Sequence, residues 1–361
     1  MADLRFHFHL WVFFASLLFQ NTSKSHVWSA ENHAPLFIFG DSLFDAGNNN
    51  NNPESPACYW PYGETFFKHP TGRASDGRVI PDFIAEYAKL PFIAPYIQIT
   101  DHQLRYGVNF ASGGAGVLDT FQEFTSDLKT QLINFKYVKK RLRNKLGESE
   151  TNALLSKAIY LFSIGNNDYM GAFNTNSSIF QHYSREEYVG MVIGSLTTVL
   201  EEIYKNGGRK FGFVSLGRLG CLPPMRAKTS SGGCLEQVNV LVKLHNKAFS
   251  NVLMKLEKQL QGFKYSNFDF YKSLSERIKH PSRYGFKEAK SACCGTGPYR
   301  GITSCGGIGK IKEFELCDDT SEYLFFDSHP TEKADHQFAK LMWSGSINVT
   351  RPYNLKQLFQ L

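Results

Sequence analysis

The sequence has few of the features that a membrane-spanning or nucleic-acid-binding protein requires. After residue 25 it contains no run of about 18 apolar residues, the length needed for a helix to cross a bilayer. The net charge is +7, but Lys and Arg are spread along the chain. Their tightest cluster, residues 136–145, is typical of a solvated helix face and has no nucleic-acid motif beside it. We therefore expect no nucleic-acid partner and no transmembrane segment.

The motifs of common cofactor and metal sites are also missing. There is no G-x-x-x-x-G-K-[ST] phosphate loop, no proper G-x-G-x-x-G fingerprint and no H-E-x-x-H metal motif. The seven cysteines show no paired C-x-x-C spacing, which argues against a zinc site. These absences predict a protein with no cofactor and no bound metal.

What the chain does have is apolar and aromatic material, at 42% and 14% of its 361 residues. That composition supports a sizeable core and excludes global disorder. No internal repeat is visible, and no linker is strong enough to divide the chain. We expect one domain over residues 26–361, preceded by a targeting segment.

The targeting segment is a secretory signal at residues 1–25. Arg5 precedes a mostly apolar stretch over residues 10–19, and a polar flank follows over residues 20–25. Cleavage between residues 23 and 31 would release an exported protein. Two sequons, at Asn176 and Asn348, would then be candidate glycan acceptors.

Cysteine usage agrees with an oxidising compartment. Cys221 and Cys234 are close enough in sequence to close a short loop. Cys293 and Cys294 are adjacent, so each is expected to pair outward. Their partners are Cys305 and Cys317, in a combination that the sequence leaves open, and Cys58 remains odd.

Strand-like and helical patterns alternate along the chain. Five apolar or aromatic runs predict strands at residues 36–39, 107–111, 158–164, 210–216 and 263–270. Helical patterns are found at residues 78–89, 127–146, 186–206 and 235–261, with a last helix opened by Pro330. This alternation predicts an α/β fold with a parallel sheet covered by helices on both faces.

Polar islands follow the strands at the points where α/β sheets place their ligands. Gly40-Asp41-Ser42 ends the first strand, a Gly-rich turn at residues 112–116 ends the second, and Asn166-Asn167-Asp168 ends the third. A fourth island, Asp327-Ser328-His329-Pro330, lies near the C-terminus. Together they contain a serine, a histidine, a carboxylate and hydrogen-bond donors, which are the groups that acyl transfer requires.

These islands resemble the GDSL esterase/lipase family, also called SGNH hydrolases. The resemblance covers residues 34–358 and is to the secreted plant branch, in which the pathogen-response lipases look most similar. The motifs that carry it are Phe39 to Asn49, Trp60-Pro61-Tyr62-Gly63, Gly72-Arg73, Ser75-Asp76-Gly77-Arg78, Val108 to Gly116, Ile164 to Asp168, and Ala292-Cys293-Cys294-Gly295 with Gly297 and Tyr299.

The resemblance implies a flavodoxin-like three-layer α/β/α sandwich with a five-stranded parallel sheet. It implies a serine esterase or lipase, located in the apoplast or cell wall and acting in plant defence on small-molecule or lipid esters. The site residues that it implies are the nucleophile Ser42, the acid Asp327, the base His329, and the oxyanion donors Ser42, Gly114 (or Gly113) and Asn167.

One departure from the family pattern concerns the acid and base. The family ends in Asp-x-x-His-Pro, whereas Asp327 and His329 are separated by a single residue. Either the turn re-forms around the shorter spacing, or another carboxylate such as Glu332 or Asp319 orients the imidazole. The alternative functions are an acyltransferase that uses the same serine, and a catalytically impaired secreted protein that binds or signals.

Overall fold

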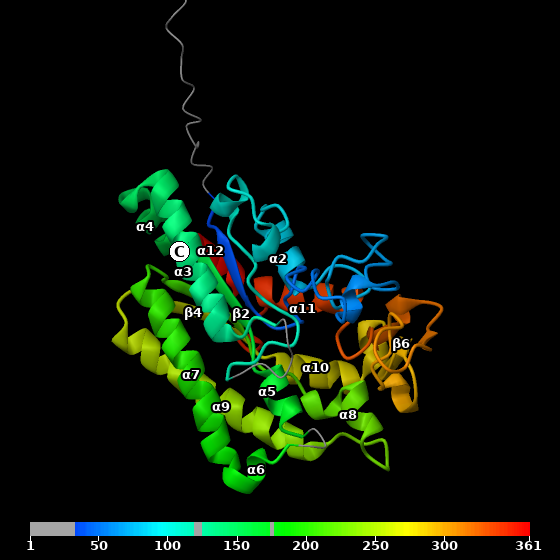
Figure 1. Cartoon of the computed structure of the whole chain (residues 1–361). Helices are drawn as coiled ribbons and strands as arrows, with labels where there is room; N and C mark the ends of the chain where they lie inside the picture. The colour runs from blue at the N-terminus through cyan, green and yellow to red at the C-terminus, as the bar shows by residue number, and fades with distance from the viewer. Residues whose placement is uncertain (1–32, 119–124, 174–176) are drawn as a thin grey trace, which may run out of the picture. The chain divides into compact units, whose positions relative to one another are not determined.

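A five-stranded sheet forms the centre of residues 34–361 in the computed structural model (Figure 1). Its order is β1 (Leu36–Gly40), β2 (Ile159–Ser163), β3 (Lys210–Val214), β4 (Lys264–Phe268) and β9 (Thr350–Pro352). The first four strands are parallel, and β9 runs antiparallel to β4. The carboxyl ends of β1 and β2 therefore meet at one edge of the sheet, where two of the polar islands begin.

The structure describes residues 33–118, 125–173 and 177–361. The signal expected at residues 1–25 and the sequon residue Asn176 lie outside the described residues. The second sequon residue, Asn348, is exposed in a turn before β9.

Rows of aromatic rings hold the parallel strands together on one face. Each ring stacks on the ring at the paired position of the next strand, with centroids 4.8 to 5.5 Å apart. The rows are Phe37–Tyr160–Phe211 and Phe39–Phe162–Phe213. Because these rings are almost completely buried, they supply much of the apolar area that stabilises the sheet.

Helices cover both faces of this sheet. On the aromatic face lie α3 (Leu128–Leu146), α7 (Arg185–Lys205) and α9 (Glu236–Gln259), where Phe135 and Phe249 pack against the rings. The opposite layer contains α2 (Ile80–Tyr87), α11 (Glu332–Ser344) and α12 (Leu355–Gln360). The other α-helices in the part of the chain that the structure describes are α4 (Glu148–Lys157), α5 (Asn166–Gly171), α6 (Ile179–His182), α8 (Pro223–Ala227) and α10 (Phe270–Lys279).

A second, smaller core lies beside the main one. It contains Tyr62, Phe326 and three of the cysteines, all buried. Two short ladders border it, β5 (Glu288–Ala292) with β8 (Tyr323–Phe325) and β6 (Cys294–Gly295) with β7 (Glu315–Leu316). Its cross-links are the disulfides Cys293–Cys317 and Cys294–Cys305.

The remaining cysteines follow the expected pattern. Cys221 and Cys234 form the third disulfide, across a sequence separation of 13 residues. Cys58 is free and half-buried. The structure thus chooses between the pairings that the sequence left open for the adjacent cysteines.

The α/β architecture and the five-stranded sheet are confirmed, with corrections to individual elements. The run at residues 107–111 lies beside β1 and bonds to Ile38, but it forms only isolated bridges. The fifth strand of the sheet is β9, which is antiparallel and was not expected. The helix expected after Pro330 is α11, which is followed by α12 and is therefore not the last. Pro330 does not open it, because Thr331 is its N-cap and accepts a hydrogen bond from Ala334 N.

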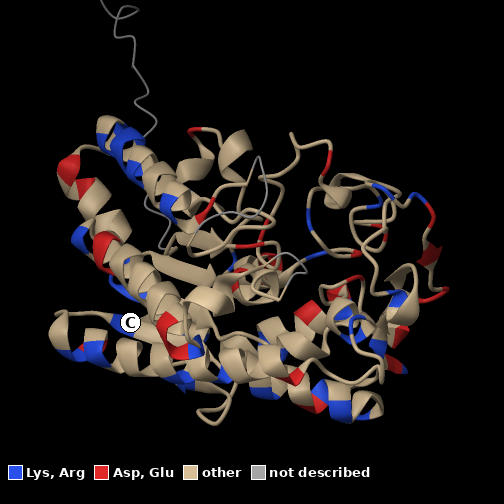
Figure 2. Ribbon diagram, turned by 60° about the horizontal axis from the view of Figure 1, so that its bottom comes forward, with Lys and Arg blue, Asp and Glu red and all other residues tan. Residues whose placement is uncertain are grey.

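Charged residues of both signs are interspersed along the helices (Figure 2). In the basic stretch of α3, Lys136 pairs with Glu202, and Arg141 and Lys145 both pair with Asp101. This stretch is therefore the solvated helix face that its spacing predicted. Among the helices of the described residues, none is both long and apolar enough to span a bilayer.

Candidate active site

Ser42 lies just past the carboxyl end of β1, in a turn that glycine makes possible. Gly40 has φ +156°, and a Cβ at this position would lie 2.3 Å from the carbonyl oxygen of Ser163 on β2. The close approach lets Asp41 N donate to that same oxygen at 3.0 Å. The backbone immediately before the serine is thus tied to both β1 and β2.

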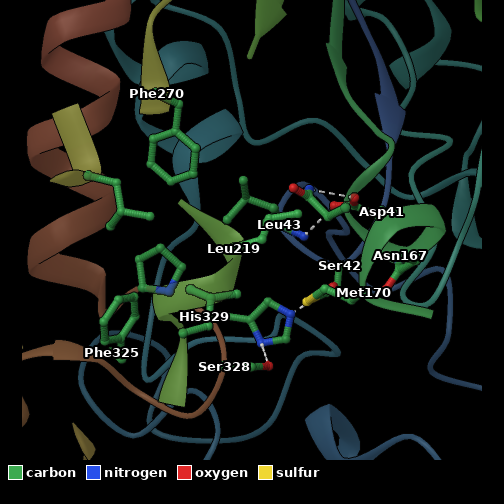
Figure 3. A pocket seen from close by; sticks show the side chains of 14 residues that line it. Asp41, Ser42, Leu43, Asn167, Met170, Leu219, Phe270, Phe325, Ser328 and His329 are labelled. Atoms are coloured by element: carbon green, nitrogen blue, oxygen red, sulfur yellow. Dashed lines mark hydrogen bonds between the residues drawn. The ribbon is translucent and has the colours of Figure 1, made fainter. Parts of the chain in front are cut away.

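Ser42, His329 and Asp327 form one continuous chain of contacts. The oxygen Oγ of Ser42 lies 2.7 Å from Nε2 of His329 (Figure 3). The other ring nitrogen, Nδ1 of His329, lies 2.7 Å from Oδ1 of Asp327. In this arrangement the serine hydroxyl donates to a neutral imidazole, whose other nitrogen donates to the carboxylate. Residues 287 positions apart are therefore within hydrogen-bond reach of each other.

The short spacing between acid and base is accommodated by a tight turn. Oδ1 of Asp327 also accepts from the backbone N–H of His329 at 2.8 Å, and Phe326 N donates to the carbonyl of His329 at 2.8 Å. The side chain of Asp327 thus folds back over the turn that contains it. Although only one residue separates the two, the carboxylate of Asp327 still reaches Nδ1 of His329.

The substitute carboxylates are engaged elsewhere. Glu332 accepts from Arg78 at 2.6 Å and from Thr65 at 2.8 Å. Asp319 caps a short helix by accepting from Ser321 N at 2.9 Å. The partner of His329 in this structure is therefore Asp327.

Electrostatics adjusts the pair for proton transfer. Burial alone would raise the pKa of Asp327, but the charge of His329 and hydrogen bonds from His329 and Tyr62 lower it. Burial alone would lower the pKa of His329, but Asp327 and, more weakly, Asp41 raise it above its ordinary value. The carboxylate is thus ionised, and the imidazole is a stronger base than an isolated histidine.

The expected oxyanion donors differ in how they are used. Gly113 N already donates to Asp45 Oδ2 at 2.9 Å. Gly114 has φ +84°, and no hydrogen bond between described residues uses its N–H or that of Ser42. Of the two glycines, Gly114 is therefore the one whose N–H is available to a substrate oxygen, although Gly114 does not line the pocket beside Ser42.

Asn167 lines that pocket from the start of α5. Its Nδ2 donates to Ala115 O at 2.8 Å, which ties the asparagine to the Gly-rich turn. A side-chain amide has two N–H donors, so one remains for a substrate oxygen. Asn167 and Ser42 line the same pocket.

Asp168 and Asp41 organise the backbone around these donors. The carboxylate of Asp168 accepts from Val117 N and Leu118 N, at 2.9 to 3.1 Å, and so anchors the end of the Gly-rich turn. Asp41 accepts from Leu43 N and from Nδ2 of Asn166, at 3.1 and 2.7 Å. Burial raises the pKa of each carboxyl to about 6 against these hydrogen bonds.

Sequence reasoning did not identify the tyrosine that contacts the acid of the site. Tyr62 is fully buried, and its hydroxyl donates to Oδ2 of Asp327 at 2.8 Å. It belongs to the Trp60-Pro61-Tyr62-Gly63 motif, to which no role had been given. The only sequence signal was that motif itself, because Tyr62 and Asp327 are 265 positions apart.

The pocket beside Ser42 is polar at one end and apolar over most of its wall. Its volume is about 480 Å³, part of it open to solvent. In Figure 3, Leu219, Phe270 and Phe325 lie on one side of the Ser42–His329 pair, and Asn167 lies on the other. The complete lining is Asp41, Ser42, Leu43, Asn166, Asn167, Met170, Leu219, Leu222, Phe270, Leu274, Phe325, Ser328, His329 and Pro330.

Comparisons with known proteins agree with this geometry. The family described as GDSL-like Lipase/Acylhydrolase matches residues 36–342. The chain is 54% identical to GDSL esterase/lipase 2 of Arabidopsis thaliana, over 91% of the chain and 90% of that protein. It is 49% identical to a GDSL lipase of Tanacetum cinerariifolium, over 92% and 89%.

A more distant relative carries a different description. The chain is 35% identical to the Inactive GDSL esterase/lipase-like protein 25 of Arabidopsis thaliana, over 100% of the chain and 81% of that protein. Relatives of this chain thus include proteins named as enzymes and one named as inactive.

Proposed function

Because the chain belongs to the GDSL-like lipase/acylhydrolase family, we propose that it hydrolyses carboxylic esters through an acyl-enzyme on Ser42. The observation that carries the proposal is the unbroken contact chain from Ser42 through His329 to Asp327, with both contacts at 2.7 Å. A family member that had lost its activity would have no need to keep these three side chains within hydrogen-bond distance of one another. We therefore favour an active enzyme over an inactive binding protein.

In the first half of the reaction, Ser42 attacks the ester carbonyl carbon. Its proton passes from Oγ to Nε2 of His329, and Asp327 stabilises the positive imidazolium that results. The carbonyl oxygen becomes an oxyanion, for which Ser42 N, Gly114 N and Nδ2 of Asn167 are the proposed donors. When the carbon–oxygen bond to the alcohol breaks, His329 returns the proton to the departing alkoxide.

In the second half, water replaces the alcohol. His329 takes a proton from the water as its oxygen attacks the acyl carbon. Collapse of the second tetrahedral intermediate breaks the bond to Ser42 Oγ, which regains its proton from His329, and the free carboxylic acid leaves. Transfer to an alcohol instead of water would use the same steps, and product analysis with added alcohol distinguishes the two outcomes.

The substrate that this pocket supports is an ester with an apolar chain. Leu219, Leu222, Phe270 and Leu274 form a wall without charge beside the reacting groups. Burying a chain against such a wall contributes about 0.8 kcal/mol for each methylene. A lipid ester or another apolar ester fits this surface better than a charged one.

We propose further that the protein is secreted, into the apoplast or cell wall, and serves in defence. Three disulfides are typical of an oxidising compartment, and Asn348 is exposed within its sequon. The resemblance to pathogen-response lipases is the ground for the defence role. Expression in plant cells tests secretion: we expect the protein in the extracellular fluid, and a loss of mass after glycosidase treatment that Asn348→Gln reduces. Retention inside the cell would contradict the proposal.

The decisive experiment on function uses a fluorophosphonate probe and a short p-nitrophenyl ester. We expect the purified protein to be labelled, and Ser42→Ala to lose labelling and at least about 10⁴-fold in kcat, as other serine hydrolases do without their nucleophile. The control is Ser149→Ala, which replaces an exposed serine at the start of α4 and should change neither. Equal turnover by Ser42→Ala and the unaltered protein would remove Ser42 from the mechanism.

A further inference from the structure

Tyr62 contacts the acid of the site from a distant part of the chain. Its side chain is fully buried, and its hydroxyl donates to Oδ2 of Asp327 at 2.8 Å. Oδ1 of the same carboxylate accepts from the backbone and the ring of His329. The two oxygens therefore have separate tasks: one faces His329, and the other faces Tyr62.

This division matters because a carboxylate rotates easily about its last bond. Rotation about the Cβ–Cγ bond of aspartate has broad, shallow minima, so packing alone does not fix the plane of the group. A donor on Oδ2 fixes that plane and keeps Oδ1 directed at Nδ1 of His329. In a triad, the orientation of the imidazole depends on this contact.

Tyr62 is itself held by the second core. Its ring packs edge-on against Phe326, with centroids 5.1 Å apart. Backbone N–H groups of Cys293 and Cys294 donate to the carbonyls of Phe325 and Phe326, at 2.9 and 2.6 Å. The disulfide-linked segment thus holds the backbone immediately before Asp327 by hydrogen bonds. The same core contains Tyr62, which holds the side chain of Asp327.

The hydroxyl can only donate in this environment. Burial, together with the adjacent charge of Asp327, raises the pKa of Tyr62 well above its ordinary value, so the proton stays on the phenol. Its hydrogen bond shares the negative charge of Asp327 and so weakens the pull of that charge on His329. The strength of the Tyr62 bond should therefore be felt in the basicity of the imidazole.

We propose that Tyr62 is a positioning residue that orients Asp327 and sets the basicity of His329. The proposal rests on the hydrolase function proposed above. A merely structural tyrosine would contribute to stability without altering the titration of the histidine. The pH profile is therefore the readout that separates the two roles.

The first experiment compares Tyr62→Phe with Tyr160→Phe. Tyr160 is also fully buried, its hydroxyl donates to Leu155 O at 3.0 Å, and it does not line the pocket beside Ser42. Each variant loses one buried hydrogen bond, so both should lose similar stability in thermal unfolding. We expect only Tyr62→Phe to lower kcat, by about 10-fold or more, with KM within about twofold.

The same variants are titrated by kcat/KM and by the rate of fluorophosphonate labelling. Without the phenol, the charge of Asp327 acts on His329 undiminished. The acid limb of the Tyr62→Phe profile should therefore move to higher pH, while that of Tyr160→Phe stays in place.

A second variant keeps the ring and the hydroxyl, so that folding is not at stake. Replacing Tyr62 by 3-fluorotyrosine makes the phenol a stronger donor, which draws charge away from Asp327. The acid limb should then move to lower pH, opposite to the Phe variant.

Unchanged kcat and unchanged acid limbs in both Tyr62 variants would overturn the inference while leaving the hydrolase proposal intact. A parent protein that neither turns over ester nor reacts with the probe would contradict the hydrolase proposal itself, and this inference with it.

Discussion

At the residue scale, the site depends on the three hydrogen bonds that Asp327 accepts. They come from the backbone of His329, from its ring and from Tyr62, all at 2.7 to 2.8 Å. A turn one residue shorter than the family pattern brings the backbone N–H of His329 under the carboxylate. In this short turn the carboxylate thus contacts both the backbone and the ring of His329.

The pH dependence of activity should report the titration of His329. The imidazole accepts the proton of Ser42 only when it is neutral, and its pKa is raised above 6.5, against the effect of burial, by Asp327 and Asp41. Activity is then full above this raised pKa and is lost as the pH falls through it. We expect the acid limb of kcat/KM to have its midpoint above pH 6.5.

Asp327→Asn provides the control for this prediction. The variant removes the main charge that raises the pKa of His329, so the acid limb of its residual activity should move to lower pH. A midpoint below about pH 6 in the unaltered protein would contradict the electrostatic account.

Asn167 should contribute to the transition state more than to binding. Asn167 lines the pocket and has a second N–H that its bond to Ala115 O does not use, and charge appears in the pocket only as the carbonyl oxygen becomes an oxyanion. We expect Asn167→Ala to lower kcat by about 10²–10³ with little change in KM. Steady-state kinetics measures this, and thermal unfolding checks that the fold persists. A loss confined to KM would place Asn167 in ground-state binding instead.

At the element scale, helix α10 decides how deep the apolar pocket is. Phe270 begins the helix and Leu274 follows one turn later, and both line the pocket. Behind them, Phe270 packs edge-on against Phe338 of α11, with centroids 4.8 Å apart. The pocket wall therefore packs against the main core. A longer acyl chain of a substrate cannot extend through the wall unless α10 moves.

Trimming this wall should change which esters are preferred. We expect Phe270→Leu to raise the ratio of kcat/KM for p-nitrophenyl octanoate to that for the butyrate by at least about fivefold. The reason is that each additional buried methylene contributes about 0.8 kcal/mol.

Phe249→Leu is the matched control, because Phe249 is a buried phenylalanine of α9 that contacts Phe213 and does not line the pocket. Equal shifts in both variants would mean that looser packing, and not the pocket wall, sets the preference.

Elements formed from local patterns were the most predictable. The helical periodicities at residues 127–146 and 186–206 became α3 and α7 with ends shifted by at most one residue. The run at residues 107–111 looked equally like a strand, but whether a segment joins a sheet depends on its neighbours. Here β9, a three-residue strand with no strong pattern, takes the fifth place by pairing with β4.

At the scale of the whole molecule, a buried acidic group limits stability. Asp335 lies in the first turn of α11 with 1% of its surface exposed, and its Oδ1 has no hydrogen-bond partner among the described residues. Burial, followed by the nearby charges of Asp76, Asp82 and Glu332, raises the pKa of Asp335 well above its ordinary value. The folded protein therefore holds this proton more tightly than the unfolded chain does.

The sign of the effect on stability follows from this difference. The stability that the protonated carboxyl of Asp335 contributes is complete below its pKa in the unfolded chain. It is lost as the pH rises through its higher pKa in the folded protein. Asp335→Asn removes this loss, so the variant should gain stability relative to its parent as the pH rises. We expect a gain of at least about 1 kcal/mol between pH 4 and pH 8 in urea unfolding.

Asp101→Asn is the control with the opposite sign. Asp101 is exposed, and hydrogen bonds from Lys145 and Arg141 lower its pKa, so its replacement should slightly destabilise the protein at neutral pH. A relative stability of Asp335→Asn that does not change with pH would show that the carboxyl of Asp335 titrates normally.

The sequence by itself determined the sheet strands that it predicted at residues 36–39 and 158–164, the main helices and the identity of the polar islands, because hydrophobic periodicity and turn residues act over a few positions. It also identified Ser42, His329 and Asp327 as types of residue suited to acyl transfer. Only the tertiary structure decided that the short turn brings Asp327 to His329, that Tyr62 holds the carboxylate, and that α10 forms the pocket wall. These contacts join segments far apart in the chain, and their geometry depends on how the two cores pack, which no local pattern encodes.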